Sequence, residues 1–266
     1  MSVSIVNPVV CKVGGALLDK PDCIDALMHA ILQIQKIRPV VLVHGGGNGV
    51  ESLLTQLGHT TEKYQGLRVT PDEQMPIISG ALAGTANKRL CADAKKAGLN
   101  PVGLSLFDGS SVQCEVMSDK LHAVGQPTPD DPTLLNQLLS SHFFPIISSI
   151  GCDHQGRLLN VNADQAATAI AALLSADLYL LSDVDAVLDD QKRSIQQLDN
   201  TEAKRLIDNG AIQHGMLVKV LAAQKAATDL SRSVIIGSWT ATQPLIAHAT
   251  QQNSVPFGTE ILPVKP

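Results

Sequence analysis

The chain has 266 residues, 44% of them hydrophobic and 17% charged, and a formal net charge of −5, which is typical of a globular protein with a sizeable core. The negative net charge, with no run of Lys or Arg, argues against a nucleic-acid partner, and the lack of an apolar run as long as a bilayer is thick argues against a membrane partner. Five cysteines lie far apart with no C-x-x-C pair, which indicates reduced thiols in a cytoplasmic protein and argues against a zinc site.

Two apolar runs near the N-terminus each end in glycines. Residues 9–13 predict a buried strand that breaks at Gly14 and Gly15, and residues 39–44 predict a second strand. Apolar residues at helical spacing, starting after Pro21, predict a helix between them. This first unit is therefore expected to be strand, helix, parallel strand.

The second strand runs into His44-Gly45-Gly46-Gly47 and then into a predicted helix over residues 50–57. Glycines let a ligand approach the backbone, and the free N–H groups of a helix N-terminus attract anions. The spacing matches neither G-x-G-x-x-G nor the P-loop, so an ordinary strand-to-helix turn and an anion site both stay open. Lys12, among apolar residues, is either a strand-end lysine reaching water or a cation directed at the same ligand.

Residues 59–69 are polar and contain few strand-forming residues, and they carry Arg68 just before a predicted helix over residues 71–97. Residues 70–73 read Thr-Pro-Asp-Glu, which predicts a capping box at that helix start. Arg68 could clamp a carboxylate or be a surface arginine. Small residues over 80–86 would let another helix approach closely, either in a homodimer or within one subunit.

The middle of the chain predicts more sheet. Strands are expected over residues 101–106 and 144–151, a hairpin flap over 112–117 and 122–125, and a short helix over 133–141. Asn160, Asn162 and Asp164 alternate before an alanine-rich helix; Asn162 is a plausible N-cap, and Asp164 would lie in the first turn. Capping does not explain all three side chains.

The last third predicts strands over residues 176–182 and 233–238, helices over 201–209 and 215–230, and a final edge strand over 257–261. An acidic loop over residues 183–189 suggests a second ligand rim, and the second helix carries Lys219. We therefore place a lobe boundary near Ser175.

These motifs together resemble the amino acid kinase family. The matching segments are residues 12–15 (KVGG), 44–47 (HGGG), 66–70 (GLRVT), 160–164 (NVNAD), 182–184 (SDV) and 215–219 (GMLVK), in order over nearly the whole chain. The resemblance implies an α/β fold, an open αβα sandwich with a mostly parallel central sheet and two lobes. Residues 1–174 would bind the phosphoryl acceptor and carry the dimerisation helix, and residues 175–266 would bind ATP.

The resemblance also implies a reaction, transfer of the γ-phosphoryl group of ATP, with Mg²⁺, to the side-chain carboxylate of N-acetyl-L-glutamate. The products are N-acetyl-L-glutamyl 5-phosphate and ADP, in arginine biosynthesis. By the same resemblance, the catalytic residues are Lys12, Lys219 and Asp164, the acceptor-binding residues are Gly46, Gly47, Arg68 and Asn160, and the phosphate-binding residues are Gly14 and Gly15. The ATP-binding residues are Asp183, Val184, Asp185, Ala186, Val187, Leu188, Ala211, Ile212 and Gln213, and no side chain is expected to ligate a metal.

The sequence departs from the family pattern in its nucleotide loop and at its N-terminus, and alternative functions stay open. Ala186 stands where glycine is expected, and Asp185 adds a charge near ATP. The first strand starts by Val9, without the helix that precedes it in resembling hexameric, arginine-inhibited enzymes, so we expect an arginine-insensitive homodimer. The alternatives are another kinase of this family, acting on glutamate, carbamate or a nucleoside monophosphate, and a non-catalytic ligand sensor.

Overall fold

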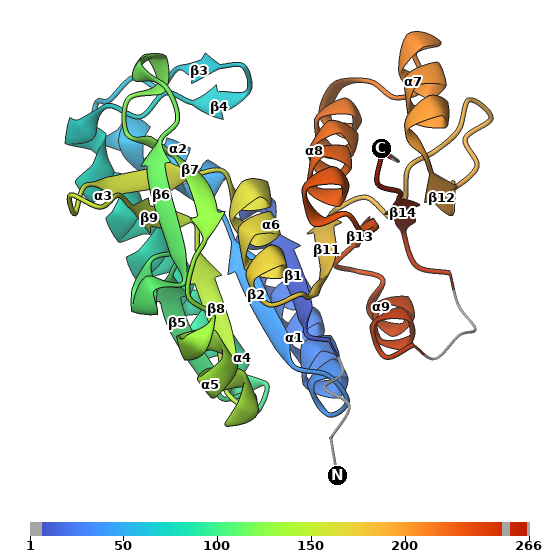
Figure 1. The fold of residues 1–266 in the computed structure, drawn as a ribbon, viewed down its shortest axis with the longest axis horizontal. Coiled ribbons are helices and arrows are strands. Elements are labelled where there is room, and N and C mark those ends of the chain that lie inside the picture. The colour runs from blue at the N-terminus through green and yellow to red at the C-terminus, as the bar shows by residue number, and fades with distance from the viewer. Residues whose placement is uncertain (1–6, 252–255, 265–266) are drawn as a thin grey trace.

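The computed structural model describes residues 7–251 and 256–264 and is built on one eight-stranded sheet (Figure 1). Adjacent strands pair in parallel except for β13 and β14, which are antiparallel. In spatial order the strands are β12 (Gln197–Leu198), β14 (Thr259–Ile261), β13 (Val234–Ser238), β11 (Asp177–Ser182), β1 (Val9–Val13), β2 (Val40–His44), β8 (Phe144–Ser148) and β5 (Pro101–Ser105). The first strand therefore lies in the middle of the sheet.

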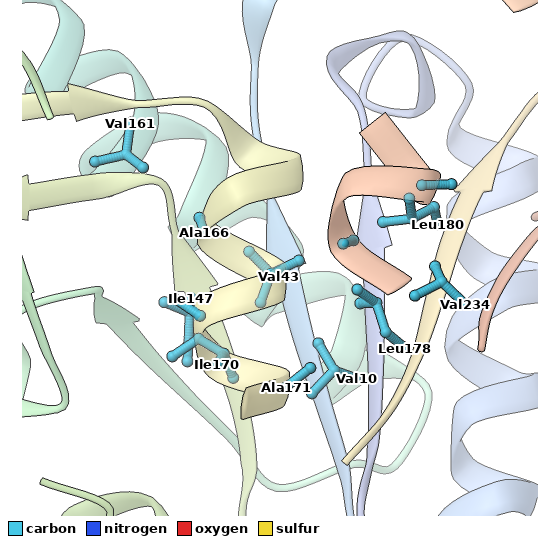
Figure 2. Packing of buried hydrophobic residues seen from close by; sticks show 14 of the residues in the cluster. Val10, Val43, Ile147, Val161, Ala166, Ile170, Ala171, Leu178, Leu180 and Val234 are labelled. Atoms are coloured by element: carbon cyan, nitrogen blue, oxygen red, sulfur yellow. The ribbon is translucent and has the colours of Figure 1, made fainter. Parts of the chain in front are cut away.

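Helices cover both faces of this sheet. Side chains alternate along β1: Val10 joins one hydrophobic cluster, and Val9, Cys11 and Val13 join the other. The first cluster contains α5 (Thr133–Ser140), α6 (Ala163–Leu173), α7 (Asn200–Asp208) and α8 (His214–Leu230), and Figure 2 shows its centre. The second contains α1 (Pro21–Gln35), α4 (Asn87–Lys96) and α9 (Thr242–Ala249). The expected αβα sandwich with a mostly parallel sheet is confirmed.

A second, four-stranded sheet lies on the side of the main sheet that holds β8 and β5 (Figure 1). Its order is β6 (Val112–Val116), β7 (Val124–Pro129), β10 (Leu158–Val161) and β9 (Ile150–Cys152). β6 and β7 pair antiparallel, so the predicted hairpin flap is confirmed. β10 leads directly into α6, where the Asn162 side chain accepts hydrogen bonds from the backbone amides of Asp164 and Gln165, as expected of an N-cap.

The long helix expected after Arg68 is divided into four helical segments. These are a 3₁₀ turn at Asp72–Gln74, α3 (Met75–Ser79), a π-helical segment at Gly80–Ala86, and α4. The predicted capping box is wrong. Pro71 is the N-cap residue, and the Thr70 hydroxyl donates to the Arg68 carbonyl and accepts from Asn160 Nδ2 instead.

Short elements account for the other differences. β14 is not an edge strand, because β12 pairs on its outer side. The polar segment before Arg68 contains a small hairpin of β3 (Lys63–Tyr64) and β4 (Leu67–Arg68), and α2 (Gly47–Gln56) begins within the glycine turn itself. The expectation that no helix precedes Val9 falls partly on residues 1–6, outside the described residues. Within residues 7–251 and 256–264, no helix combines the length and apolar character needed to cross a bilayer.

Candidate active site

The two glycine turns pack backbone against backbone at the carboxyl ends of β1 and β2, where open parallel sheets place their ligands. A Cβ on Gly15 would lie 2.7 Å from the Gly47 nitrogen and 2.9 Å from the Gly46 carbonyl carbon. A Cβ on Gly46 would lie 2.5 Å from Leu82 Cδ2. No side chain caps α2, which begins at Gly47, so its first amides are available to an anion.

Lys12 lies on β1 on the same face as Val10, two residues earlier, which is the face covered by α6 and α8. Its Nζ is 2.8 Å from Oδ1 of Asp164 in the first turn of α6. Both side chains are largely buried, at 16% and 27% exposed. The sheet and the capped helix therefore hold this ion pair in a fixed position at the edge of the glycine turns.

A cavity of about 240 Å³ joins the site residues expected from the first part of the chain. Its lining includes Lys12, Gly14, Gly15, Gly46, Gly47, Arg68, Asn160 and Asp164. Apolar side chains that the sequence reasoning did not single out close it, among them Ile78 and Leu82 from the helix after Arg68. Their helical spacing alone could not distinguish a cavity wall from ordinary core.

Arg68 is engaged on one side only. Its Nη2 lies 2.6 Å from Oε2 of Glu51 and 3.4 Å from the Gly47 carbonyl oxygen, while its Nη1 is buried without a hydrogen-bond partner among the described residues. Glu51 also accepts a hydrogen bond from the Thr61 hydroxyl. Sequence reasoning missed Glu51 and Thr61, because the pairing depends on how the β3–β4 hairpin folds over α2.

Lys219 comes from α8 and lies beside the carboxyl end of β11, the strand that pairs with β1. Its Nζ lies 3.1 Å from Ser182 Oγ and 3.3 Å from Oδ1 of Asp183, just after β11. Partial burial raises the pKa of Asp183, but the hydrogen bond and charge of Lys219, helped by Lys20, leave that pKa below its ordinary value. A small cavity of about 40 Å³ is lined by both Lys12 and Lys219, together with Asp164 and Ser182. The two lysines therefore share one cavity.

The other residues expected near ATP lie in different environments. Asp183, Asp185 and Leu188 are exposed, whereas Ala186, Val187 and Ile212 have buried side chains, so only the backbone of those three could face a ligand. The Val187 amide donates to the Thr259 hydroxyl. Ala211 packs partly buried against the core. Gln213 is exposed and precedes α8, whose N-terminus has no side-chain cap.

A buried polar pair lies beneath the glycine turn. His44 Nδ1 is 3.0 Å from the Gly45 carbonyl oxygen, and His44 Nε2 is 3.1 Å from Asn87 Nδ2, which also donates to the Ile146 carbonyl. The imidazole is therefore neutral, with its proton on Nδ1 facing the turn. Burial lowers the pKa of His44 from its ordinary 6.5 to about 4, against a raising contribution from the Gly45 carbonyl.

This shift predicts acid destabilisation. The unfolded imidazole takes up a proton near pH 6.5 and the folded one only near pH 4, so the contribution of His44 to stability is complete above pH 6.5 and is lost as pH falls toward 4. The full loss is about 3 kcal/mol. Urea unfolding at pH 7 and pH 5 should show a smaller decrease in the free energy of unfolding for His44→Gln than for the wild type. Equal decreases would contradict this assignment.

Sequence comparison places the chain among phosphotransferases. The model of the amino acid kinase family matches residues 7–238. Over 236 residues, 88% of this chain and 92% of the relative, the chain is 51% identical to a protein of Edwardsiella ictaluri (strain 93-146) named acetylglutamate kinase.

Solved structures share the fold. Protein smu.665 of Streptococcus mutans UA159 matches with a TM-score of 0.77 at 27% identity, covering 96% of this chain and 98% of that one. N-acetylglutamate synthase of Neisseria gonorrhoeae, complexed with coenzyme A and N-acetyl-glutamate, gives 0.79 at 22% identity over 96% and 59% of the two chains. Carbamate kinase of Giardia gives 0.62 at 18% identity over 98% and 100%.

Proposed function

This chain belongs to the amino acid kinase family, and on that premise we propose that it transfers the γ-phosphoryl group of ATP to the side-chain carboxylate of N-acetyl-L-glutamate. The products are N-acetyl-L-glutamyl 5-phosphate and ADP, in arginine biosynthesis. The observation that carries the proposal is the cavity shared by Lys12 and Lys219, which adjoins the glycine-lined cavity through Lys12 and Asp164. It supplies cations between an anionic acceptor and an anionic donor, as a kinase needs and a simple ligand sensor does not.

We assign the acceptor to the cavity of about 240 Å³, which is lined entirely by residues of the proposed 1–174 lobe. The unpartnered Nη1 of Arg68 supports this assignment, since a carboxylate would satisfy a buried donor. Asn160 and the amides of Gly46 and Gly47 offer further polar groups around the same space. The apolar side chains of Ile78 and Leu82 suit the carbon skeleton and the acetyl group.

Charge neutralisation and positioning supply the catalysis. The transferring phosphoryl group spreads negative charge over its equatorial oxygens, and the acceptor carboxylate is already ionised at neutral pH, so no general base is needed. Lys12 stabilises this charge from the acceptor side, and Lys219 from the donor side. Asp164, 2.8 Å from Lys12, orients that lysine rather than removing a proton.

ATP belongs to the proposed 175–266 lobe. The uncapped N-terminus of α8 after Gln213 and the exposed loop at residues 183–188 offer backbone donors and polar side chains near Lys219. In the part of the chain that the structure describes, no group of three or more His, Cys, Asp or Glu side chains is placed to hold a metal. We propose that Mg²⁺ is carried by the triphosphate, where it would neutralise phosphate charge.

We further propose a cytoplasmic homodimer that arginine does not inhibit. Gly80, Gly84 and Thr85, on the helical stretch after Arg68, are exposed in the single chain, which supports a close contact with a second copy. Size-exclusion chromatography with light scattering checks this state, and a hexamer, or inhibition by arginine, would contradict it.

A coupled ADP assay tests the function. ADP should form fastest with N-acetyl-L-glutamate and ATP, should require Mg²⁺, and should form much more slowly with glutamate, carbamate or a nucleoside monophosphate. Faster turnover of one of these would assign the chain to another activity of the family. Binding of N-acetyl-L-glutamate without ADP formation would indicate a sensor.

Arg68→Lys should raise the KM for the acceptor about 10- to 100-fold, the value of one or two lost hydrogen bonds to a charged group. Lysine retains the charge, but it lacks the planar guanidinium that can pair with Glu51 through one nitrogen and present another to the acceptor. The KM for ATP should be unchanged, since Arg68 lies in the acceptor cavity. An unaltered acceptor KM would show that Arg68 does not bind the acceptor.

A further inference from the structure

We propose that Glu51 is a positioning residue for the acceptor: it holds Arg68 by Nη2 and thereby leaves Nη1 free for an acceptor carboxylate. The inference rests on the proposed function, because it takes the acceptor carboxylate as the ligand of Arg68. Glu51 lies on α2, one turn beyond the glycine turn, and neither motif nor resemblance assigns it a role.

Both oxygens of the Glu51 carboxylate are used, one by a residue of the β3–β4 hairpin and the other by a residue just before it. Oε2 is 2.6 Å from Nη2 of Arg68 on β4, and Oε1 accepts from the hydroxyl of Thr61, just before β3. Hydrogen bonding from Thr61 and, against partial desolvation, from Arg68 keeps the pKa of Glu51 below its ordinary value, so the carboxylate is charged at neutral pH. Glu51 therefore ties α2, which begins at the acceptor cavity, to the hairpin that carries Arg68.

Arg68 is therefore fixed by Glu51 through Nη2, while Nη1 still lacks a hydrogen-bond acceptor among the residues that the structure describes. The Arg68 side chain is only 12% exposed, and its Nη1 is buried with no partner in the described ranges, 7–251 and 256–264. A buried guanidinium donor without an acceptor costs free energy, and a bound carboxylate would remove that cost. Arg68 lines both the acceptor cavity and a neighbouring cavity of about 490 Å³, which Glu51 and Thr61 also line.

Holding the side chain matters because a free arginine side chain populates many rotamers. A free Arg68 would have to be ordered when the acceptor binds, and that cost would weaken binding. The Glu51 charge opposes the acceptor charge, but its side chain is 42% exposed, so water and salt screen the repulsion. Pre-ordering is therefore the larger effect, and removal of Glu51 should weaken acceptor binding rather than strengthen it.

The test is Glu51→Gln, which keeps the size and shape of the side chain but replaces the carboxylate that pairs with Arg68 by a neutral amide. We expect the KM for N-acetyl-L-glutamate to rise about 3- to 10-fold, the equivalent of ordering one long side chain on binding. The kcat and the KM for ATP should stay within about twofold of wild type, a split that general destabilisation would not produce. Thr61→Val, which removes only the second contact, should raise the acceptor KM by a smaller factor.

A matched control and a double-mutant cycle complete the experiment. Glu62 is exposed, lies next to Thr61 and pairs with no cation in the described part of the chain, so Glu62→Gln should leave the acceptor KM unchanged. In an Arg68→Met background, Glu51→Gln should change that KM less than twofold, because Glu51 acts through Arg68.

An unchanged or lowered KM for Glu51→Gln, or an equal factor in both backgrounds, would overturn the proposal. A wild-type protein that forms no ADP from N-acetyl-L-glutamate would contradict the proposed function, whereas an active wild type with an unaffected Glu51→Gln variant contradicts only the role of Glu51.

Discussion

Lys12→Ala should lower kcat about 100- to 1,000-fold, the usual effect of removing one preorganised group that stabilises transition-state charge. Lys12 lines both the acceptor cavity and the cavity that it shares with Lys219. The other cations that line them do not replace it, because Arg68 is assigned to the acceptor carboxylate and Lys219 lies on the donor side. Steady-state kinetics with saturating ATP and acceptor measures the change.

The fold should survive this substitution. Lys12 and Asp164 are largely but not completely buried, at 16% and 27% exposed, so water can still reach Asp164 when its partner is removed, and Tm should fall by only a few degrees. Lys96→Ala is the matched control, since this exposed lysine pairs with Asp25 on the surface, 2.9 Å away, and lines neither cavity. A kcat for Lys12→Ala within threefold of wild type would remove Lys12 from the proposed chemistry.

Gly15→Ala should reduce both stability and activity. The added Cβ would meet the backbone of Gly46 and Gly47 at 2.9 and 2.7 Å, and backbone cannot move aside as the end of a flexible side chain does. Overpacking of this kind costs about 1–3 kcal/mol. A displacement of the glycine turn by about 1 Å can lower turnover about 100-fold, because the turn's amides would no longer face the reacting groups.

Gly49→Ala provides the comparison. Gly49 lies in α2, two residues after Gly47, and a Cβ there would meet no atom within 4 Å. Alanine favours a helix over glycine by about 1 kcal/mol, so thermal unfolding should show an equal or higher Tm. If Gly15→Ala matched Gly49→Ala in both Tm and turnover, the close packing of the two turns would be unimportant.

The architecture was predictable because the main strands are long apolar runs and their ends carry glycines. Residues 9–13 and 40–44 form β1 and β2, and the resemblance placed Lys12 and Asp164 in one site that the structure brings to 2.8 Å. The two-residue strands β3, β4 and β12 have neither a long apolar run nor a terminal glycine pair that would predict them. β12, at Gln197–Leu198, is too short for a period to be visible, so β14 was wrongly expected at the edge.

Local patterns failed where tertiary contacts compete with them. Thr70 has the sequence of a capping residue, but its hydroxyl bonds to the Arg68 carbonyl and to Asn160, ninety residues away in the chain. Glu51 was missed for a related reason: its partner Arg68 lies on a hairpin whose fold no local period indicates, and its partner Thr61 lies just before that hairpin. The positions assigned to ATP came from resemblance alone and stay a prediction.

The central place of β1 has a consequence for how the chain is made. One edge of β1 pairs with β2, which follows soon in the sequence, but the other edge pairs with β11, which begins only at Asp177. During translation at about 5–20 residues per second, that edge stays open while the ribosome works from Val13 to Asp177. An unpaired apolar strand edge is a template for association with other chains. The nascent polypeptide therefore passes through a period in which a chaperone should engage its N-terminal half more strongly than the finished protein.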